Sequence, residues 1–195
     1  MQRCAWCLGS ENNLRYHDEE WGRPVHDDRK HFEYLSLEAM QCGLSWSIIL
    51  GKRKILRECF SWFNFAEISN YTDADVERIM NTAGMIRSER KIRAIISNAA
   101  AFEQIREEFG SFDKYIWAFT NNRVHVYLKH HRGGTETHNS LSEKISKELK
   151  KRGFKFLGSV CVYSYLQASG IINDHSPDCF VYRELAEAKN AEYIK

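Results

Sequence analysis

The sequence predicts an all-helical protein. In most segments apolar residues recur at spacings of three and four, as on the buried face of a helix, and strand-like alternation is scarce. Pro24 and Pro177 are the two prolines in 195 residues, so little interrupts long helices. Since 43% of the residues are hydrophobic, the chain can bury a real core, and we expect a single domain over residues 1–195.

Two amphipathic helices are predicted early in the chain, over 28–40 and 45–60. Their apolar faces are Phe32, Leu35 and Ala39 in the first, and Ile48, Ile49, Leu56 and Phe60 in the second.

A helix-hairpin-helix is predicted over residues 73–109. Thr72 with Asp75 resembles a capping box that opens a short helix, which ends near Gly84. After a tight turn, the segment 88–109 keeps one continuous apolar face up to a glycine stop. Exposed amides at such a turn attract an oxyanion, so the hairpin suits a DNA phosphate.

Basic residues gather at this turn. Gly84, Arg87, Arg90 and Lys91 are therefore candidate DNA contacts. The alternative is an ordinary helical turn with a solvated basic edge. A second basic cluster, in 147–155, is weaker evidence because cations also complement the end of a helix.

Two helices are predicted in the last third of the chain. Ser140 with Glu143 is expected to cap a helix that closes at Gly153, and 158–168 forms a more apolar helix. The charged tail after Arg183 is expected to be a marginal helix.

The stretch 121–139 is irregular and rich in His and Gly. Its weak alternation at Val124, Val126 and Leu128 predicts either a surface loop or a frayed hairpin.

Charge and hydropathy narrow the class of protein. Lys and Arg number 28 against 26 Asp and Glu, a net charge of +2 that neither demands nor excludes a polyanionic partner. The chain lacks an apolar run of about 18 residues and an apolar leader, which predicts a soluble cytoplasmic protein with no membrane contact.

Four residues of the types that zinc prefers lie in two spaced pairs near the chain ends. The pairs are Cys4 with His17, and His175 with Cys179. Two thiolates and two imidazoles complete a tetrahedral set and leave no position for water or substrate. We therefore expect one structural Zn²⁺ per chain, joining the terminal segments.

The joined segments are expected at 1–20 and 170–182. Cys7 forms a Cys-x-x-Cys pair with Cys4 and offers a fifth possible ligand. The remaining cysteines have apolar neighbours and are expected to be small buried core residues without chemistry: Cys42, Cys59 and Cys161.

Three aromatic residues and one acid near these pairs are candidates for a binding pocket: Trp6, Tyr16, Trp46 and Glu38. Glu38 lies in an apolar helical run, so its carboxylate is either enclosed or on a polar surface. An enclosed carboxylate needs a donor or a cation, which an N-alkylated base provides. Aromatic rings stack on a flipped base and favour a cationic one, although core packing is the alternative for each Trp.

Four segments form a long and specific pattern: YHDEEWG at 16–22, LEAMQCGLSW at 37–46, KKRGFKFLG at 150–158 and NDH at 173–175. They resemble the 3-methyladenine DNA glycosylase I family over nearly the whole chain. The resemblance implies an all-helical bacterial helix-hairpin-helix glycosylase that releases N3-methyladenine from alkylated double-stranded DNA, with a structural zinc joining its termini.

Matched by position, the resemblance implies these site residues: Cys4, His17, His175 and Cys179 as zinc ligands, and Trp6, Tyr16, Glu38 and Trp46 as the base pocket. Methylation at N3 makes the adenine a good leaving group, so modest catalysis suffices. We expect Glu38 to accept hydrogen bonds from the flipped base while water attacks the sugar carbon in a monofunctional hydrolase. Asp113 is expected to be a helix cap.

Two other functions remain open from the residues. One is a catalytically inactive, zinc-stapled module that binds DNA lesions through the hairpin. The other is a zinc-dependent hydrolase, which the closed ligand set disfavours. A second metal would need four histidines that we expect to be solvated loop residues: His125, His130, His131 and His138. No protein partner is implied, and a monomer is expected.

Overall fold

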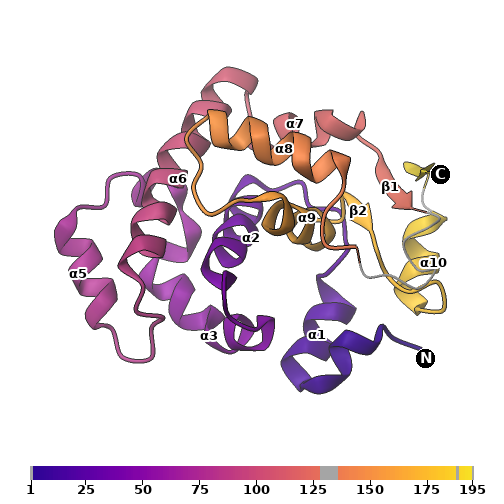
Figure 1. The fold of residues 1–195 in the computed structure, drawn as a ribbon, viewed down its shortest axis with the longest axis horizontal. Helices are drawn as coiled ribbons and strands as arrows, with labels where there is room; N and C mark the ends of the chain where they lie inside the picture. Colours follow the sequence, from indigo (N-terminus) through magenta and orange to yellow (C-terminus); the bar gives the residue numbers. More distant parts are fainter. Residues whose placement is uncertain (1, 128–135, 188, 195) are drawn as a thin grey trace.

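The computed structural model describes residues 2–127, 136–187 and 189–194 and is mostly helical (Figure 1). The α-helices are α1 (Glu11–Glu19), α2 (Asp28–Gln41), α3 (Trp46–Cys59), α4 (Phe65–Ile68), α5 (Asp73–Asn81), α6 (Glu89–Phe109), α7 (Phe112–Trp117), α8 (Ser140–Lys151), α9 (Ser159–Ala168) and α10 (Phe180–Ala186). Three short 3-10 helices are η1 (Ala5–Gly9), η2 (Ser61–Phe63) and η3 (Ala118–Thr120). Within these ranges no helix is long and apolar enough to cross a bilayer.

The predicted hairpin helices are confirmed. Thr72 and Asp75 form a capping box at the start of α5, in which the Thr72 N–H donates to the Asp75 carboxylate at 3.0 Å. Ser88 is the N-cap residue of α6, and Gly110 ends that helix with a φ of 83°. A left-handed residue at this position suits glycine, which has no Cβ to clash.

One capping prediction was wrong. Asn139, and not Ser140, caps α8: its side chain accepts from the Ser142 amide at 2.9 Å, while the Asn139 amide donates to the Ser142 hydroxyl at 3.0 Å. The two bonds satisfy amides that a helix start leaves without partners. Asn is as good a cap as Ser, so the helix begins one residue earlier than the Ser140–Glu143 spacing suggested.

Asp113 is also not a helix cap. The cap of α7 is Ser111, whose hydroxyl accepts from the Lys114 amide at 3.0 Å. The Asp113 carboxylate instead accepts from His26 Nδ1 at 3.0 Å and faces His31 Nε2 at 3.3 Å. Asp113 therefore joins α7 to the segment around the start of α2.

The expectation of an all-helical fold was wrong for one small sheet. β1 (Val124–Tyr127) lies between β2 (Ile172–Asn173) and β3 (Ala191–Ile194), and both pairings are parallel. Val124 and Val126 are buried, so the weak alternation marks a strand and not a hairpin. Leu128 lies outside the described residues.

The C-terminal tail differs from the expected marginal helix in the same way. After the short helix α10 the chain extends and pairs β3 with β1 along its whole length, in a register that places Val124 opposite Ala191 and Tyr127 opposite Ile194. β1 offers backbone groups on this edge, and the tail segment pairs with them because Tyr193 and Ile194 favour strands.

Helix α2 is the centre of the core (Figure 1). Every residue from 31 to 40 is buried, with α3, α6, α7 and α9 packed around it. A helix enclosed on all sides has no polar face, so the polar residues within it are held away from water. The hairpin of α5 and α6 and the two chain ends lie at opposite sides of the molecule (Figure 1).

Gly170 makes a close contact that tests this packing. Its φ is +70°, and an added Cβ would lie 2.4 Å from Arg23 C and from Pro24 N. We expect Gly170→Ala to lower the free energy of unfolding by at least about 2 kcal/mol, measured by urea denaturation, because both the backbone angle and the contact are unfavourable. Gly51→Ala is the control: it lies inside α3 with open space around it and should stabilise by up to about 1 kcal/mol. Equal midpoints for the two variants would contradict this account.

Candidate active site and metal centre

The four predicted pocket residues come from four elements. Trp6 lies in η1, Tyr16 in α1, Glu38 in α2, and Trp46 is the first residue of α3. The Tyr16 ring centroid is 5.4 Å from that of Trp46 and 6.4 Å from that of Trp6, so Tyr16 contacts both tryptophans. Trp6 is 40% exposed, whereas Tyr16 is buried. The aromatic cluster thus runs from the surface to the interior.

Glu38 is 3% exposed, so the alternative of a carboxylate on the polar surface is wrong. Burial raises its pKa to about 8, because the charged form has lost its water. The carboxyl group is therefore mostly protonated at neutral pH while no ligand faces it. A cation or a set of N–H donors beside it would favour the ionised form.

Three of the pocket residues carry buried polar atoms that find no hydrogen-bond partner among the described residues: Tyr16 Oη, Glu38 Oε2 and Trp46 Nε1. Burial first, and then the charges of Tyr34 and Glu38, raise the pKa of the Tyr16 phenol well above its usual range. The Tyr16 phenol and the Glu38 carboxyl group therefore interact electrostatically. Each unpaired buried group costs about 1–3 kcal/mol, so their grouping indicates a site prepared for a polar ligand.

An ion network that the sequence did not reveal supports the outer side of Tyr16. The Arg53 guanidinium donates to both oxygens of Glu20 at 2.8 Å and to Glu33 at 2.7 Å, and it lies 6.0 Å from the Tyr16 ring. Burial opposes ionisation of Glu20, but the bonds from Arg53 and Lys30 outweigh it and lower the pKa of that carboxyl group to about 2. This network fastens α1 to α2 and α3.

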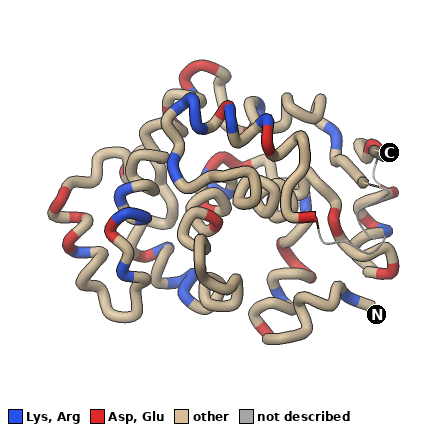
Figure 2. Tube along the Cα trace, viewed as in Figure 1, with Lys and Arg blue, Asp and Glu red and all other residues tan. Residues whose placement is uncertain are grey.

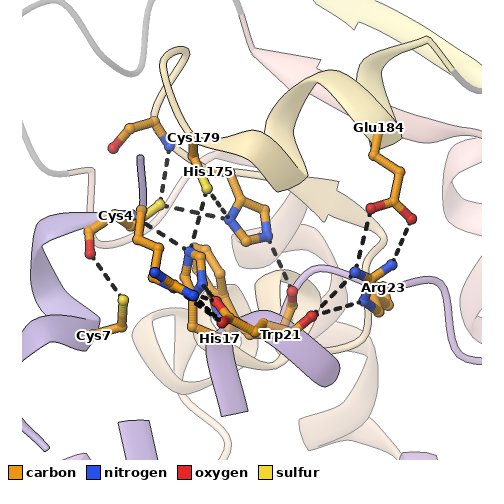
Figure 3. A network of polar contacts seen from close by, with 11 residues as sticks. Cys4, Cys7, His17, Trp21, Arg23, His175, Cys179 and Glu184 are labelled. Atoms are coloured by element: carbon orange, nitrogen blue, oxygen red, sulfur yellow. Dashed lines mark hydrogen bonds and ion pairs between the residues drawn. The ribbon is translucent and has the colours of Figure 1, made fainter. Parts of the chain in front are cut away.

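The four predicted metal ligands lie together and are buried. One ligand atom from each of Cys4, His17, His175 and Cys179 falls within 4.8 Å of the others. Cys4 Sγ is 3.5 Å from His175 Nδ1, and Cys179 Sγ is 3.4 Å from His17 Nε2 and 3.6 Å from His175 Nδ1 (Figure 3). The group offers a metal ion four ligand atoms at the junction of the two chain ends.

Each imidazole is oriented by a second hydrogen bond. His17 Nδ1 donates to Asp18 at 2.8 Å, and His175 Nε2 donates to the Trp21 carbonyl at 3.0 Å. The other nitrogen of each ring then has its lone pair free for a metal ion. Gly22 permits this placement, because a Cβ there would lie 2.5 Å from His175 Nε2.

Cys7 does not belong to this cluster. Its thiol donates to the Cys4 carbonyl at 3.0 Å (Figure 3), and its sulfur is not one of the ligand atoms that lie within 4.8 Å of one another. Within the cluster, burial raises the pKa of the Cys4 thiol to about 11 and lowers that of His175 to about 3. The imidazole is therefore neutral, as a metal requires, whereas the buried thiol ionises only with help from a cation.

The hairpin presents some of its predicted DNA contacts and not others. Gly84 has a φ of +79° and is exposed together with Arg87 and Arg90. Lys91, in contrast, is 9% exposed, and its ammonium donates to the carbonyls of Met40 at 2.7 Å and Cys42 at 2.5 Å. Lys91 caps the end of α2 and is not a free phosphate contact. Figure 2 shows basic positions grouped at the start of α6.

The loop histidines form no second site among the residues described. His125 lies in β1, where burial lowers its pKa, and His138 is exposed and lies 3.5 Å from Glu143. His130 and His131 lie outside the described residues.

Comparison with known proteins decides the family. The profile of the methyladenine glycosylase family matches residues 6–182. The chain belongs to this family.

Among curated methyladenine glycosylases, the DNA-3-methyladenine glycosylase 1 of Escherichia coli is 41% identical over 182 residues, covering 93% of this chain and 97% of the relative. The Haemophilus influenzae DNA-3-methyladenine glycosylase is 37% identical over 91% of this chain and 96% of its own length. The 3-methyladenine DNA glycosylase I of Staphylococcus aureus, solved to explain 3-methyladenine recognition, is 34% identical with a TM-score of 0.88, over 92% of this chain and 96% of that one.

The raised pKa of Glu38 predicts that the free energy of unfolding depends on pH. The folded state holds a proton on Glu38 up to about pH 8, whereas the unfolded chain loses it near 4.5, so stability falls as pH rises between these values. We expect Glu38→Gln to exceed the wild type in free energy of unfolding by an amount that grows from pH 5 to pH 8 and reaches a few kcal/mol. Urea denaturation at a series of pH values measures the difference. A constant difference across the series would show that Glu38 is not held protonated.

Proposed function

We propose that this protein is a DNA repair glycosylase that hydrolyses the N-glycosidic bond of N3-methyladenine in alkylated double-stranded DNA. The observation that carries the proposal is the buried carboxyl group of Glu38, which has an oxygen unpaired among the described residues. The Tyr16 hydroxyl and the Trp46 N–H are unpaired in the same sense, and their ring centroids lie 5.4 Å apart. The names of its relatives, all 3-methyladenine DNA glycosylases, support the same activity. A base must leave the duplex to enter such a pocket, so flipping is part of the proposal.

Discrimination follows from the state of Glu38. With the pocket empty the carboxyl group is neutral, and a neutral adenine gives it little reason to ionise. A base methylated at N3 brings a positive charge, which favours the carboxylate and the stacking of Tyr16 and Trp46 on its ring. The binding energy is therefore greater for the damaged base than for its neutral parent.

Cleavage requires little further help from the protein. The methylated base already carries the positive charge that a general acid would otherwise supply, so water attacks the sugar carbon as the bond to the base breaks. Glu38 accepts hydrogen bonds from the departing base. Lys91 is engaged with two backbone carbonyls and supplies no amine nucleophile, in keeping with a monofunctional hydrolase.

We also propose that Cys4, His17, His175 and Cys179 bind one Zn²⁺ as a structural ion. With usual zinc–sulfur and zinc–nitrogen bonds, the edge between S and N of a tetrahedron is about 3.6 Å. The S to N separations of 3.4–3.6 Å match this edge. With all four positions filled by protein, the ion braces the terminal segments and leaves no place for substrate.

For the DNA surface we propose Gly84, Arg87 and Arg90. The exposed backbone of a glycine turn and the flanking guanidinium groups bind phosphates without reading sequence. Lys91 contributes by holding the end of α2, and so the turn before Trp46, in place.

The release of free base tests the role of Glu38. From methylated duplex DNA, we expect Glu38→Gln to release 3-methyladenine with a kcat/KM about 10–100-fold below that of the wild type, because a charge-assisted bond to the base is lost. Chromatography of the released bases gives the measurement, and the exposed Glu107→Gln on α6 is the matched control. A wild type that binds methylated DNA but releases no base would favour the inactive lesion-binding module instead.

Metal analysis tests the zinc proposal. The purified protein should contain about one zinc per chain, and Cys179→Ser should lose both the metal and several kcal/mol of unfolding free energy. Cys7→Ser should keep its zinc, because the Cys7 thiol donates to the Cys4 carbonyl and lies outside the four-residue cluster. Loss of metal in Cys7→Ser, or none in the wild type, would refute the ligand set.

Salt-dependent DNA binding tests the hairpin. We expect Arg87→Ala to weaken binding to duplex DNA and to reduce the slope of log K against log salt by about 1, the signature of one lost phosphate contact. Arg93→Ala is the control, because Arg93 is paired with Asp73 and Glu89. Lys91→Met should lower stability and leave the salt slope unchanged. Equal slopes for Arg87→Ala and Arg93→Ala would contradict the proposed surface.

A further inference from the structure

Two cysteines outside the metal cluster lie in contact. Cys42 Sγ and Cys161 Sγ are 3.4 Å apart, although 119 positions separate them in the sequence. Cys42 follows the last residue of α2, and Cys161 lies in the first turn of α9. Both side chains are partly exposed, contrary to the expectation that they are buried core residues. The pair is therefore more accessible to solvent than the buried cysteines Cys4, Cys7, Cys59 and Cys179.

The surroundings hold the two sulfur atoms in place. The Cys42 sulfur lies 3.8 Å from the Glu38 carbonyl and 3.9 Å from the Phe156 carbonyl, so its single S–H donates to one or the other, and the Cys42 carbonyl accepts from Lys91. A disulfide needs the sulfur atoms about 2.05 Å apart, so they must approach by about 1.4 Å in total. Small rotations of two side chains supply a movement of this size.

We propose that Cys42 and Cys161 are a site of reversible disulfide formation. Both S–H bonds break and one S–S bond forms, while hydrogen peroxide takes up the two electrons and two protons and leaves as two waters. A dithiol reverses the step. Cys42 and Cys161 are separate from the proposed zinc ligands, and Cys59 is only 4% exposed. We therefore expect the oxidant to react first with the Cys42–Cys161 pair.

The Cys42–Cys161 pair lies close in sequence to two of the proposed base-binding residues. Cys42 lies four residues after Glu38 and four before Trp46, in the turn that connects α2 to α3. A disulfide would attach this turn to α9. Because it also closes a long loop in the unfolded chain, the oxidised protein should unfold at a higher temperature than the reduced one.

Peptide mapping of the zinc-loaded full-length protein tests the proposal without any measure of base release. The native protein is treated with hydrogen peroxide, its remaining thiols are alkylated, and it is cut with trypsin and a protease that cleaves before aspartate. Cys42 then falls in peptide 31–52 and Cys161 in peptide 156–173, each with one cysteine. Mass spectrometry should find these two peptides joined, and dithiothreitol should separate them.

Matched variants complete the test. Cys42→Ser and Cys161→Ser should each lose the joined peptides and the rise in melting temperature, whereas Cys59→Ser should keep both, and zinc content should stay constant. Three results would overturn the proposal. They are joined peptides that form only in denaturant, oxidation of Cys42 to a sulfinic acid with no partner, and crosslinks that involve Cys4 or Cys179 in place of this pair.

Discussion

An enclosed carboxyl group is the constraint around which this fold is arranged. Glu38 stands in a helix that is surrounded by other helices, and one of its oxygens meets no donor in the part of the chain that the structure describes. Folding brings no compensation for that burial, so the group keeps its proton until a ligand provides a partner. The helices packed around α2 keep water away from the carboxyl group.

Two groups of interactions hold α1, the helix that carries Tyr16, against the rest of the molecule. On one side Arg53 joins α1 to α2 and α3 through Glu20 and Glu33, and on the other the four-ligand cluster joins α1 to the C-terminal segment. Tyr16 and His17 are neighbours in sequence, so the cluster and the pocket share one helical turn. A change in the cluster would therefore act on Tyr16 through the position of α1.

The sequence predicted the parts of this molecule that depend on local patterns. Helical periodicity located α2, α3 and α6, and the types and spacing of Cys4, His17, His175 and Cys179 predicted a cluster that the structure brings together. The small sheet was not predicted, because a strand of four residues shows little periodicity and its partner strands lie far away in the sequence. Lys91 was assigned to DNA because sequence cannot tell which side of α6 faces the end of α2. The Arg53 network was missed for the same reason.

β1 pairs in parallel with β2 and β3, which both come later in the chain. In the same way, Cys4 and His17 lie beside His175 and Cys179. These contacts between distant segments set an order of assembly on the ribosome. Helices α2, α3, α6 and α7 precede α9 in the chain, so they are able to pack together before α9 covers the remaining side of α2. The sequence places β2, β3, His175 and Cys179 after α9. The full burial of Glu38 and the junction of α1 with the C-terminal segment are therefore late steps of folding during synthesis.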